Sequence, residues 1–427
     1  MLYITGGTLI DPASGYHGKK DIVVRDDRIA TIANPGTIPV PAAADNVIDA
    51  SGRIVTAGLV DPHVHFRDPG QTEKEDILTG AAAAAKGGYT SVIMMGNTIP
   101  HPDNADTIRY MLEKGARTGI RVYAAGNVTR EMRGETLTDA KALKEAGAVV
   151  LTDDGLPVRS ARVMREACKQ AAQAGMMISL HEEDPLFIRE NGINAGEVAR
   201  ETGLTGASRE AEIVMVARDI EIARETGCTL TVQHISAAET VALIRRAKAE
   251  GVRIHAEATP HHFTLTEDAV RTHGTNAKMN PPLRTEHDRA AIIEGLADGT
   301  IEMIATDHAP HTAAEKARPF TEAPSGIIGL ETALSLGIRE LVNPGHLTME
   351  ALLKCMSANP ARITGIPGGS VREGEYADLL VFDPQAAWKV SSFRSKAVNS
   401  PFTGETLPGV VHVTICGGKT VYEKKAE

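Results

Sequence analysis

Residues 57–95 read AGLVDPHVHFRDPGQTEKEDILTGAAAAAKGGYTSVIMM. A short apolar β run at 59–60 leads through a polar segment to an alanine-rich stretch at 76–86, whose composition favours a helix. A second apolar β run follows at 92–95. A strand, a helix and a second strand in this order predict one unit of a parallel sheet.

The same alternation of β runs and helical stretches continues to about residue 365. Eight such β runs predict that the sheet closes into a (β/α)8 TIM-like barrel, so the expected fold class is α/β. The predicted strands are 59–60, 92–95, 122–125, 149–151, 177–180, 230–232, 254–256 and 303–305. The predicted helices are 76–86, 104–118, 139–145, 160–174, 209–226, 237–249 and 286–297.

The two ends of the chain have a different pattern, made of short β runs separated by turns. Neither end is large enough to bury a core alone, since an isolated hairpin is marginal in water. We therefore predict that residues 1–56 and 368–427 form one small β-sandwich domain, and that residues 57–367 form the barrel.

Composition narrows the class of protein. The 427 residues have a formal net charge of −10, which argues against nucleic acid or anionic membranes as partners, because both attract basic patches. The four cysteines form no CxxC pair, and neither a signal peptide nor an apolar run of about 18 residues is visible. A cytoplasmic enzyme with reduced thiols is expected.

Two histidines, His63 and His65, stand at alternate positions where the first barrel strand is predicted to end. Alternate side chains of a strand point the same way, so this pair can bind one metal ion together. The carboxyl ends of the strands form the catalytic face of such a barrel. An HxH pair alone is a weak signal, because two polar residues on an exposed strand look the same.

Metal-binding residue types recur at the ends of four more predicted strands, which is hard to obtain by chance. They are Asp153-Asp154, His181, His234 and Asp307. Imidazole and carboxylate ligands without thiolate suit zinc or another first-row divalent ion. Because one catalytic zinc takes only about three protein ligands, we expect a carboxylate that bridges two ions.

With these residues in place, the chain resembles the metal-dependent amidohydrolase superfamily and, within it, the dihydroorotases of the class I bacterial type. The resemblance extends over essentially the whole chain. The motifs that carry it, in order, are DPHVHFRDPGQTEKED (61–76), GNTIPHPDN (96–104), TDDG (152–155), HEED (181–184), QHIS (233–236), NPPLR (280–284), ATDHAPH (305–311) and GIIGLETAL (326–334).

The resemblance implies roles for individual residues. It implies one metal ion on His63, His65 and Asp307, a second on His181 and His234, and Asp154 between them, the choice of Asp154 over Asp153 resting on alignment register. It also implies two zinc ions per chain and Asp307 as the catalytic acid/base. The implied substrate-binding residues are His65, Arg67, Asn97, Asn280, His311 and the backbone of Ser325 and Gly326.

Two positions depart from the family pattern. Gly96 stands in the stretch that is usually MPNTxP, which loosens the turn that aims Asn97, and the position of Ser325 is variable in such enzymes. These departures bear on the shape of the substrate rim rather than on the chemistry.

The implied reaction is the reversible ring opening of dihydroorotate to N-carbamoyl-L-aspartate in de novo pyrimidine (UMP) biosynthesis. A bound divalent ion lowers the pKa of water to about 7 and polarises a carbonyl, both of which a ring amide requires. Arg67 offers a planar fork of donors that matches a carboxylate. It follows His65 by two residues, so on a continuing strand it would point to the same side.

Two alternatives stay open at this level. A hydantoinase or allantoinase could use the same barrel, although many bridge their metals with a carboxylated lysine and no lysine lies between Val149 and Arg159. A non-catalytic homologue could instead scaffold another pyrimidine-pathway enzyme, but it would be expected to lose metal ligands. The partner expectations are a homodimer and association with a transcarbamoylase. Residues 312–324 form a polar segment that could cover the site.

Overall fold

The computed structural model describes residues 1–39 and 46–425. Its centre is an eight-stranded parallel sheet in which each strand pairs with its neighbours in chain order. This order confirms the predicted barrel. The strands are β8 (Leu59–Val64), β9 (Tyr89–Met94), β10 (Arg121–Gly126), β11 (Ala148–Leu151), β12 (Ile178–Leu180), β13 (Leu230–Val232), β14 (Ile254–Ala258) and β15 (Met303–Ile304).

The barrel closes just beyond its last strand. Val64 at the end of β8 forms a parallel bridge with His308, which follows β15. The backbone N–H of His65 donates to the carbonyl of His308 at 2.9 Å. The closure therefore joins the first and last strands at the same end of the sheet, beside residues that the sequence nominates as ligands.

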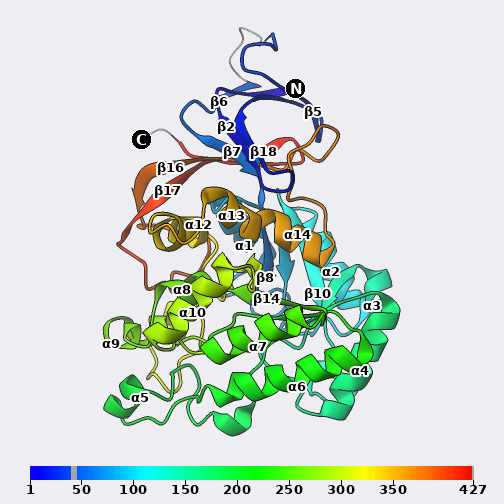
Figure 1. The fold of residues 1–427 in the computed structure, drawn as a ribbon, viewed down its shortest axis with the longest axis vertical. Helices are drawn as coiled ribbons and strands as arrows, with labels where there is room; N and C mark the ends of the chain where they lie inside the picture. Colours follow the sequence, from blue (N-terminus) through cyan, green and yellow to red (C-terminus); the bar gives the residue numbers. More distant parts are fainter. Residues whose placement is uncertain (40–45, 426–427) are drawn as a thin grey trace.

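Helices surround the sheet, as Figure 1 shows for α4, α6 and α7. Each long helix occupies a predicted helical stretch to within a few residues. These are α1 (Ile77–Lys86), α2 (Ala105–Gly115), α3 (Ala140–Ala146), α4 (Ala161–Ala174), α6 (Glu210–Thr226), α7 (Ala238–Ala249) and α10 (Glu286–Ala297). Within residues 1–39 and 46–425, no helix is long and apolar enough to cross a membrane.

Shorter helices and turns lie in the connections and after the barrel. They are α5 (Glu197–Glu201), α8 (Pro260–Thr264), α9 (Ala269–His273), α11 (Ala313–Lys316), α12 (Ala333–Gly337), α13 (Met349–Leu353) and α14 (Asn359–Thr364). The 3-10 turns are η2 (Arg130–Met132), η3 (Pro185–Phe187) and η4 (Gly274–Ala277), and the π turns are η5 (Ile338–Val342) and η6 (Lys354–Ala358).

The two ends of the chain share a sheet. A six-stranded sheet has the order β18-β17-β16-β7-β2-β3, and a four-stranded sheet has the order β5-β4-β1-β6. Their strands are β1 (Leu2–Thr5), β2 (Thr8–Asp11), β3 (Tyr16–Lys19), β4 (Asp21–Arg25), β5 (Arg28–Ala33), β6 (Val47–Asp49), β7 (Ile54–Ala57), β16 (Leu379–Lys389), β17 (Thr406–Cys416) and β18 (Lys419–Glu423).

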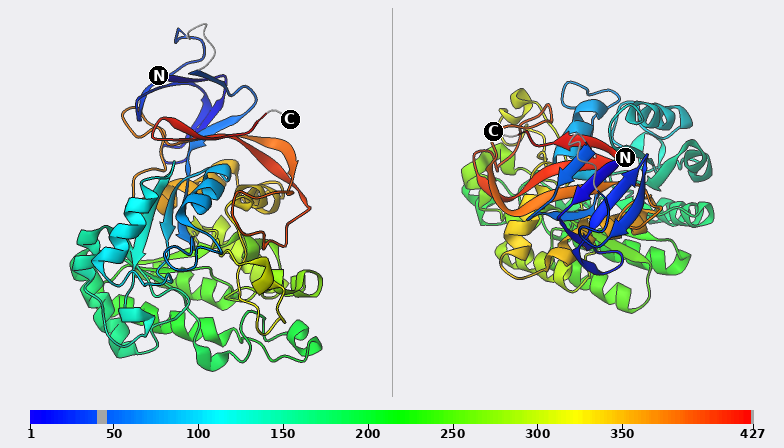
Figure 2. Two further views of the ribbon diagram at one scale, coloured as in Figure 1. Left: turned by 180° about the vertical axis from the view of Figure 1, so that it is seen from behind. Right: turned by 90° about the horizontal axis from the view of Figure 1, so that it is seen from above.

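The junction between the two ends is the antiparallel pairing of β7 with β16, in which Val55 lies opposite Val381. Figures 1 and 2 show both sheets at one end of the molecule, with both chain termini there and the barrel below. A separate apolar cluster fills the space between the sheets, with Ile4, Ile22 and Ile415 among its members. The domain boundaries at 56/57 and 367/368 stay a prediction.

Strands β2 and β3 were not expected from the sequence. The residues of β3 are Tyr-His-Gly-Lys, and most of them are exposed at the edge of the six-stranded sheet. An edge strand with one neighbour and no buried face lacks the alternation of apolar and polar residues on which such predictions depend.

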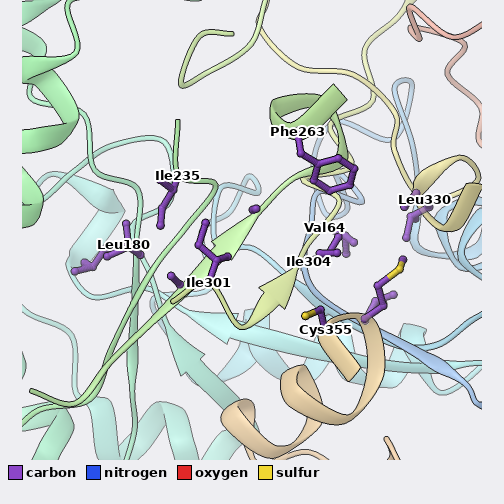
Figure 3. Packing of buried hydrophobic residues seen from close by; sticks show 14 of the residues in the cluster. Val64, Leu180, Ile235, Phe263, Ile301, Ile304, Leu330 and Cys355 are labelled. Atoms are coloured by element: carbon purple, nitrogen blue, oxygen red, sulfur yellow. The ribbon is translucent and has the colours of Figure 1, made fainter. Parts of the chain in front are cut away.

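The barrel core draws on elements that are far apart in the sequence. In Figure 3, Val64, Leu180 and Ile304 extend from three different strands, and Phe263 extends from α8. All four side chains are buried. Because protein interiors are close-packed, this layer gives the strand ends that carry the polar residues little freedom to shift.

One contact in this core ties helix α1 to the site. Gly80 of α1 lies against Phe66, the residue after His65, and a Cβ at position 80 would lie 2.3 Å from Phe66 Cδ1. Phe66 is fully buried, so its ring has no free space to enter. The glycine is therefore required by close packing of the helix on the first strand end.

Replacing Gly80 with alanine is expected to lower the stability of the protein. Alanine favours a helix over glycine by about 1 kcal/mol, but overpacking a core costs about 1–3 kcal/mol, so the clash outweighs the gain. Thermal unfolding of metal-matched proteins measures the difference. The exposed Ala82 provides a control, since Ala82→Gly changes helix propensity alone. An unchanged or higher Tm for Gly80→Ala would contradict the expectation.

Candidate metal centre

The side chains of His63, His65, Asp154 and Asp307 meet at the carboxyl ends of the barrel strands. His63 lies in β8, His65 directly follows it, Asp154 follows β11 and Asp307 follows β15. His65 Nε2 lies 2.9 Å from Asp307 Oδ1 and 3.4 Å from Asp154 Oδ2. His63 Nε2 lies 3.5 Å and 3.6 Å from the same two oxygens.

The carboxylate of Asp154 lies between two pairs of histidines. Its Oδ2 faces His63 and His65, and its Oδ1 lies 3.6 Å from His181 Nδ1 and 3.7 Å from His234 Nε2. Burial opposes the ionisation of Asp154, but the charge of His63 and the contacts with His181 and His234 hold its pKa well below the usual value. Each carboxylate oxygen is thus directed at one pair of imidazoles.

The neighbouring Asp153 is turned away from this cluster. Its Oδ1 accepts the backbone N–H of Val128 at 2.9 Å, and its Oδ2 accepts both the N–H and the hydroxyl of Thr129. Burial raises the pKa of Asp153 to about 6 in spite of these bonds. The geometry therefore distinguishes the two aspartates, which the sequence could separate only by alignment register.

The inner nitrogens of the histidines face the cluster, and their outer nitrogens face other polar groups. The outer Nδ1 of His65 lies 2.9 Å from Asn97 Oδ1, and the outer Nε2 of His181 lies 2.9 Å from Glu183 Oε2. The outer Nδ1 of His63 lies 3.4 Å from Glu257 Oε2. Hydrogen-bond acceptors at the outer nitrogens can take the ring protons there, so the inner nitrogens can act as ligands of a cation.

This arrangement fits a metal centre. Two groups of ligand atoms lie within 4.8 Å of one another, namely His63, Asp154 and His234, and His63, His65 and Asp307. His63 Nε2 is buried without a hydrogen-bond partner, and His181 Nδ1 lies only 3.1 Å from His234 Nε2. Lone pairs and carboxylates this close repel one another unless a cation lies between them.

The backbone is strained at three residues of the site. Arg67, His234 and Asp307 have φ values of 58°, 31° and 47°. Left-handed backbone at residues other than glycine costs on the order of 1–3 kcal/mol, and it persists where the surrounding structure holds it. Such outliers cluster at functional sites, so the strain supports a functional reading of these strand ends.

Glu257 and Glu183 were missed by reasoning from the sequence. Glu183 is visible in the motif HEED, two residues after His181, and Glu257 lies within the buried strand β14. A carboxylate inside a buried apolar strand is unusual and was the available signal. Outer carboxylates of this kind fix the tautomer and orientation of a ligating histidine.

Asp61 supports the site through the backbone. Its Oδ1 accepts the N–H groups of His63 at 3.1 Å and Thr306 at 3.2 Å, and its Oδ2 accepts the hydroxyl of Thr306 at 2.5 Å. Burial raises the pKa of Asp61 to about 7. This carboxyl group therefore ties together the first and last strand ends of the barrel.

The Arg67 guanidinium is buried beside the cluster without an ion pair. Its Nε donates to Pro310 O at 3.3 Å, and its Nη2 lies 3.4 Å from His311 Nε2. Among the described residues, no carboxylate oxygen lies within 4.0 Å of it. The sequence predicted that Arg67 would point toward the metal ligands because it continued the strand of His65. That reason is wrong, because β8 ends at Val64 and the chain turns at Arg67.

His311 is neutral and lies beside Arg67. Burial, together with the charge of Arg67, lowers the pKa of His311 to about 2. Its Nε2 lies 2.9 Å from the carbonyl oxygen of Ser325, which assigns the proton to Nε2. Among the described residues, its Nδ1 is buried without a hydrogen-bond partner. His311, Arg67 and Ser325, which the sequence predicted to bind the substrate, therefore lie side by side.

The remaining predicted substrate residues are Asn97, Asn280 and Gly326, and some of their polar groups already have partners within the described chain. Asn97 Oδ1 is engaged by His65, and Asn280 Oδ1 is buried without a hydrogen-bond partner. The N–H of Gly326 donates to Lys278 O at 2.8 Å, and its carbonyl accepts from Lys316 Nζ and Asn399 Nδ2. Among the described residues, the amide N–H of Ser325 donates to no backbone acceptor, so this group can serve a ligand.

Of three further histidines, His261 lies close enough to the cluster to be affected by its charges, and the side chains of His255 and His308 face other groups. The charges of Asp307, His234 and His63 act on His261, whose pKa is lowered to about 4 chiefly by burial. His255 instead lies 3.0 Å from Glu302, which precedes β15 at the opposite end of the sheet. The side chain of His308 faces Glu75 and the N–H of Gly329 rather than the ligands.

Comparison with known proteins gives a consistent picture. A model of the amidohydrolase family matches residues 54–421. The dihydroorotase of Clostridioides difficile (strain 630) is 50% identical over 422 residues, which cover 99% of this chain and all of that protein. The dihydroorotase of Clostridium acetobutylicum is 48% identical over 427 residues, covering all of both chains.

A solved structure is similar over the same extent. The L-hydantoinase (dihydropyrimidinase) from Arthrobacter aurescens superposes with a TM-score of 0.89 at 26% identity, covering all of this chain and 96% of the other. The barrel and the sheets built from the chain ends are therefore shared with a protein of much lower sequence identity than the two dihydroorotases.

Proposed function

The chain belongs to the amidohydrolase family, and from that membership we propose that it interconverts N-carbamoyl-L-aspartate and dihydroorotate in de novo pyrimidine synthesis. It is a cyclic amide hydrolase, as identity of about half over the full length to dihydroorotases supports. The observation that carries the choice of substrate is the buried guanidinium of Arg67, which has no carboxylate partner among the described residues.

We propose that the site holds two zinc ions. His63, His65 and Asp307 would hold one, His181 and His234 would hold the other, and Asp154 would be shared by both. Bound zinc supplies Lewis acidity and lowers the pKa of water to about 7. The set contains imidazole and carboxylate donors without thiolate, as catalytic zinc sites often do.

The protein's own groups then perform the proton transfers and orient the substrate. Burial opposes the ionisation of Asp307, but the hydrogen bond from His65 and the charges of His63 and His65 hold its pKa well below the usual value. Asp307 is therefore a carboxylate that can take a proton from the attacking nucleophile and return it to the leaving ring nitrogen. Ring closure uses the same groups in reverse.

Substrate orientation is assigned to the polar groups around Arg67, beside the histidine cluster. A carboxylate can accept from the fork of Arg67 and from the N–H of Ser325, while the Asn97 side chain keeps its amide nitrogen for the ligand. A buried charge without a partner is costly, so a substrate anion would compensate the guanidinium.

The hydantoinase alternative is less well supported. Plain hydantoin has no carboxylate to pair with Arg67, and the similar hydantoinase structure shares only 26% of its residues with this chain. A non-catalytic scaffold would be expected to lose metal ligands. The six residues proposed as ligands are all present and directed at one another, which argues against this alternative. Turnover of dihydroorotate, N-carbamoyl-L-aspartate and hydantoin by the purified protein tests the proposal, and turnover of hydantoin alone would overturn it.

Replacing Arg67 with methionine is expected to weaken the use of dihydroorotate selectively. The change removes the charged donors and keeps an unbranched stem, and a charged hydrogen bond is worth about 1.5–3 kcal/mol, or tenfold and more in kcat/KM. Dihydrouracil, which lacks the carboxylate, should be affected far less. The measurement is kcat/KM for both compounds at equal metal content. Equal losses would mean that Arg67 is structural.

Assembly and location complete the proposal. A homodimer and association with a transcarbamoylase are proposed from the family resemblance, and a cytoplasmic location is proposed from the composition of the chain. Sedimentation of the purified protein, alone and with a transcarbamoylase from the same source, measures the first two.

A further inference from the structure

Two lysine side chains are buried beside residues 320–326, the segment that contains Ser325. Lys278 follows η4 and Lys316 ends α11, and their exposed fractions are 4% and 6%. Among the described residues, no carboxylate oxygen lies within 4.0 Å of either ammonium group. Fully buried lysine without an acidic partner is rare, because desolvation of the charge is costly.

Both ammonium groups donate to backbone carbonyls of the 320–326 segment. Lys278 Nζ donates to the carbonyls of Phe320 at 2.6 Å and Ala323 at 2.7 Å. Lys316 Nζ donates to the carbonyls of Pro324 and Gly326, each at 3.0 Å. The two carbonyls held by Lys316 therefore flank Ser325 on either side.

Further contacts close the same assembly. The N–H of Gly326 donates to the carbonyl of Lys278 at 2.8 Å. Gly192, from the connection after β12, leaves no room for a side chain, because a Cβ there would lie 2.5 Å from Lys278 Cγ and 2.7 Å from Ser325 Oγ. Three separate segments thus converge on the stem of Lys278 and the side chain of Ser325.

The segment held in this way reaches the substrate side of the site. Ser325 O accepts the hydrogen bond from His311 Nε2 at 2.9 Å, and that nitrogen lies 3.4 Å from Arg67 Nη2. The charge of Lys316 also acts on His311. Burial lowers the pKa of Lys316 to about 7, with repulsion from Lys278 adding to the effect, so the pair is held at an energetic cost.

We propose that Lys278 and Lys316 are positioning residues, which hold residues 320–326 and thereby hold the Ser325 amide and His311 beside Arg67 to receive the carboxylate of the substrate. The role rests on the proposed function. The polar segment 312–324 is in this view a fixed wall of the site, since α11 and the two ammonium groups hold it, rather than a loop that opens and closes.

The test compares Lys278→Met and Lys316→Met with Lys248→Met. Methionine keeps the stem and removes the donors. Lys248 is the control at the opposite end of the barrel, where its Nζ donates to the carbonyl of Thr300 at 2.7 Å and also pairs with Glu302. The KM and kcat for dihydroorotate are measured at equal metal content, and amide hydrogen exchange is followed across residues 317–326.

If the substrate carboxylate is bound less well while the reacting groups stay intact, KM rises and kcat is nearly unchanged. We expect both site variants to raise KM about tenfold or more, to change kcat less than about threefold, and to speed exchange across 317–326. The Lys248 variant should match the wild type in all three. If a methionine variant does not fold, glutamine at the same position, which keeps an uncharged donor, takes its place in the comparison.

Two outcomes would overturn the positioning role. One is KM within twofold of the wild type for both lysine variants, and the other is a fall in kcat with KM unchanged. A wild-type protein that does not turn over dihydroorotate would instead reject the proposed function. In that case the exchange measurement still decides whether the two lysines hold the segment, so the two failures are distinguishable.

Discussion

Asp307→Asn is expected to reduce turnover by roughly 10²–10⁴-fold, the range typical of lost general acid/base catalysis. The amide keeps the size and one oxygen of the carboxylate but cannot accept a proton. Asp307 Oδ1 lies 2.9 Å from His65 Nε2 and 3.5 Å from His63 Nε2, so this carboxylate lies within the histidine cluster. Steady-state kinetics on protein with measured metal content gives the effect.

Metal content separates the two roles of Asp307. If the variant retains the metal of the wild type and is slowed 10²-fold or more, the loss belongs to proton transfer. Asp139→Asn, at the exposed N-cap of α3, is the matched control and should leave kcat unchanged. A loss of tenfold or less with metal retained would assign the proton transfer to another group.

Removal of metal is expected to abolish activity, and zinc is expected to restore it. The inner nitrogens of His63, His65 and His181 lie against carboxylates or against another imidazole, so without a cation the site balances these groups only by taking up protons. We expect one to two zinc ions per purified chain by elemental analysis. Full turnover by rigorously metal-free protein would reject the metal centre.

A pair of adjacent aspartates sharpens this test. Asp154→Asn removes the charge shared by the two histidine pairs, and we expect it to lower the metal content and the activity together. Asp153→Asn makes the same chemical change one residue away, where the carboxyl group is occupied by Thr129 and Val128. Its metal content should equal that of the wild type. Equal metal loss in both variants would mean that the effect is structural.

The barrel and its polar strand ends could be predicted because both depend on local patterns. Apolar runs alternate with helical stretches, and His63, His181, His234 and Asp307 each stand at or just after such a run. The parallel sheet then brings these strand ends to one face whatever the details of packing. The residue types and their places in the chain were sufficient for this part of the site.

What could not be predicted depends on contacts between distant segments. The direction of Arg67 follows from a turn with φ of 58°, not from continued strand alternation. Lys278 and Lys316 look like ordinary surface lysines in the sequence, and only the folded chain places their ammonium groups among buried carbonyls. Glu257 is likewise a single carboxylate in the sequence, and only the folded chain shows that it faces the imidazole ring of His63.

The pairing of β7 with β16 has a consequence for synthesis of the chain on the ribosome. Strand β7 emerges before the barrel, and its partner emerges after the barrel is complete. Until then the N-terminal strands expose an unpaired edge, which is a template for association with other chains. A nascent chain stalled or cleaved before residue 379 therefore lacks the strand that covers this edge of β7.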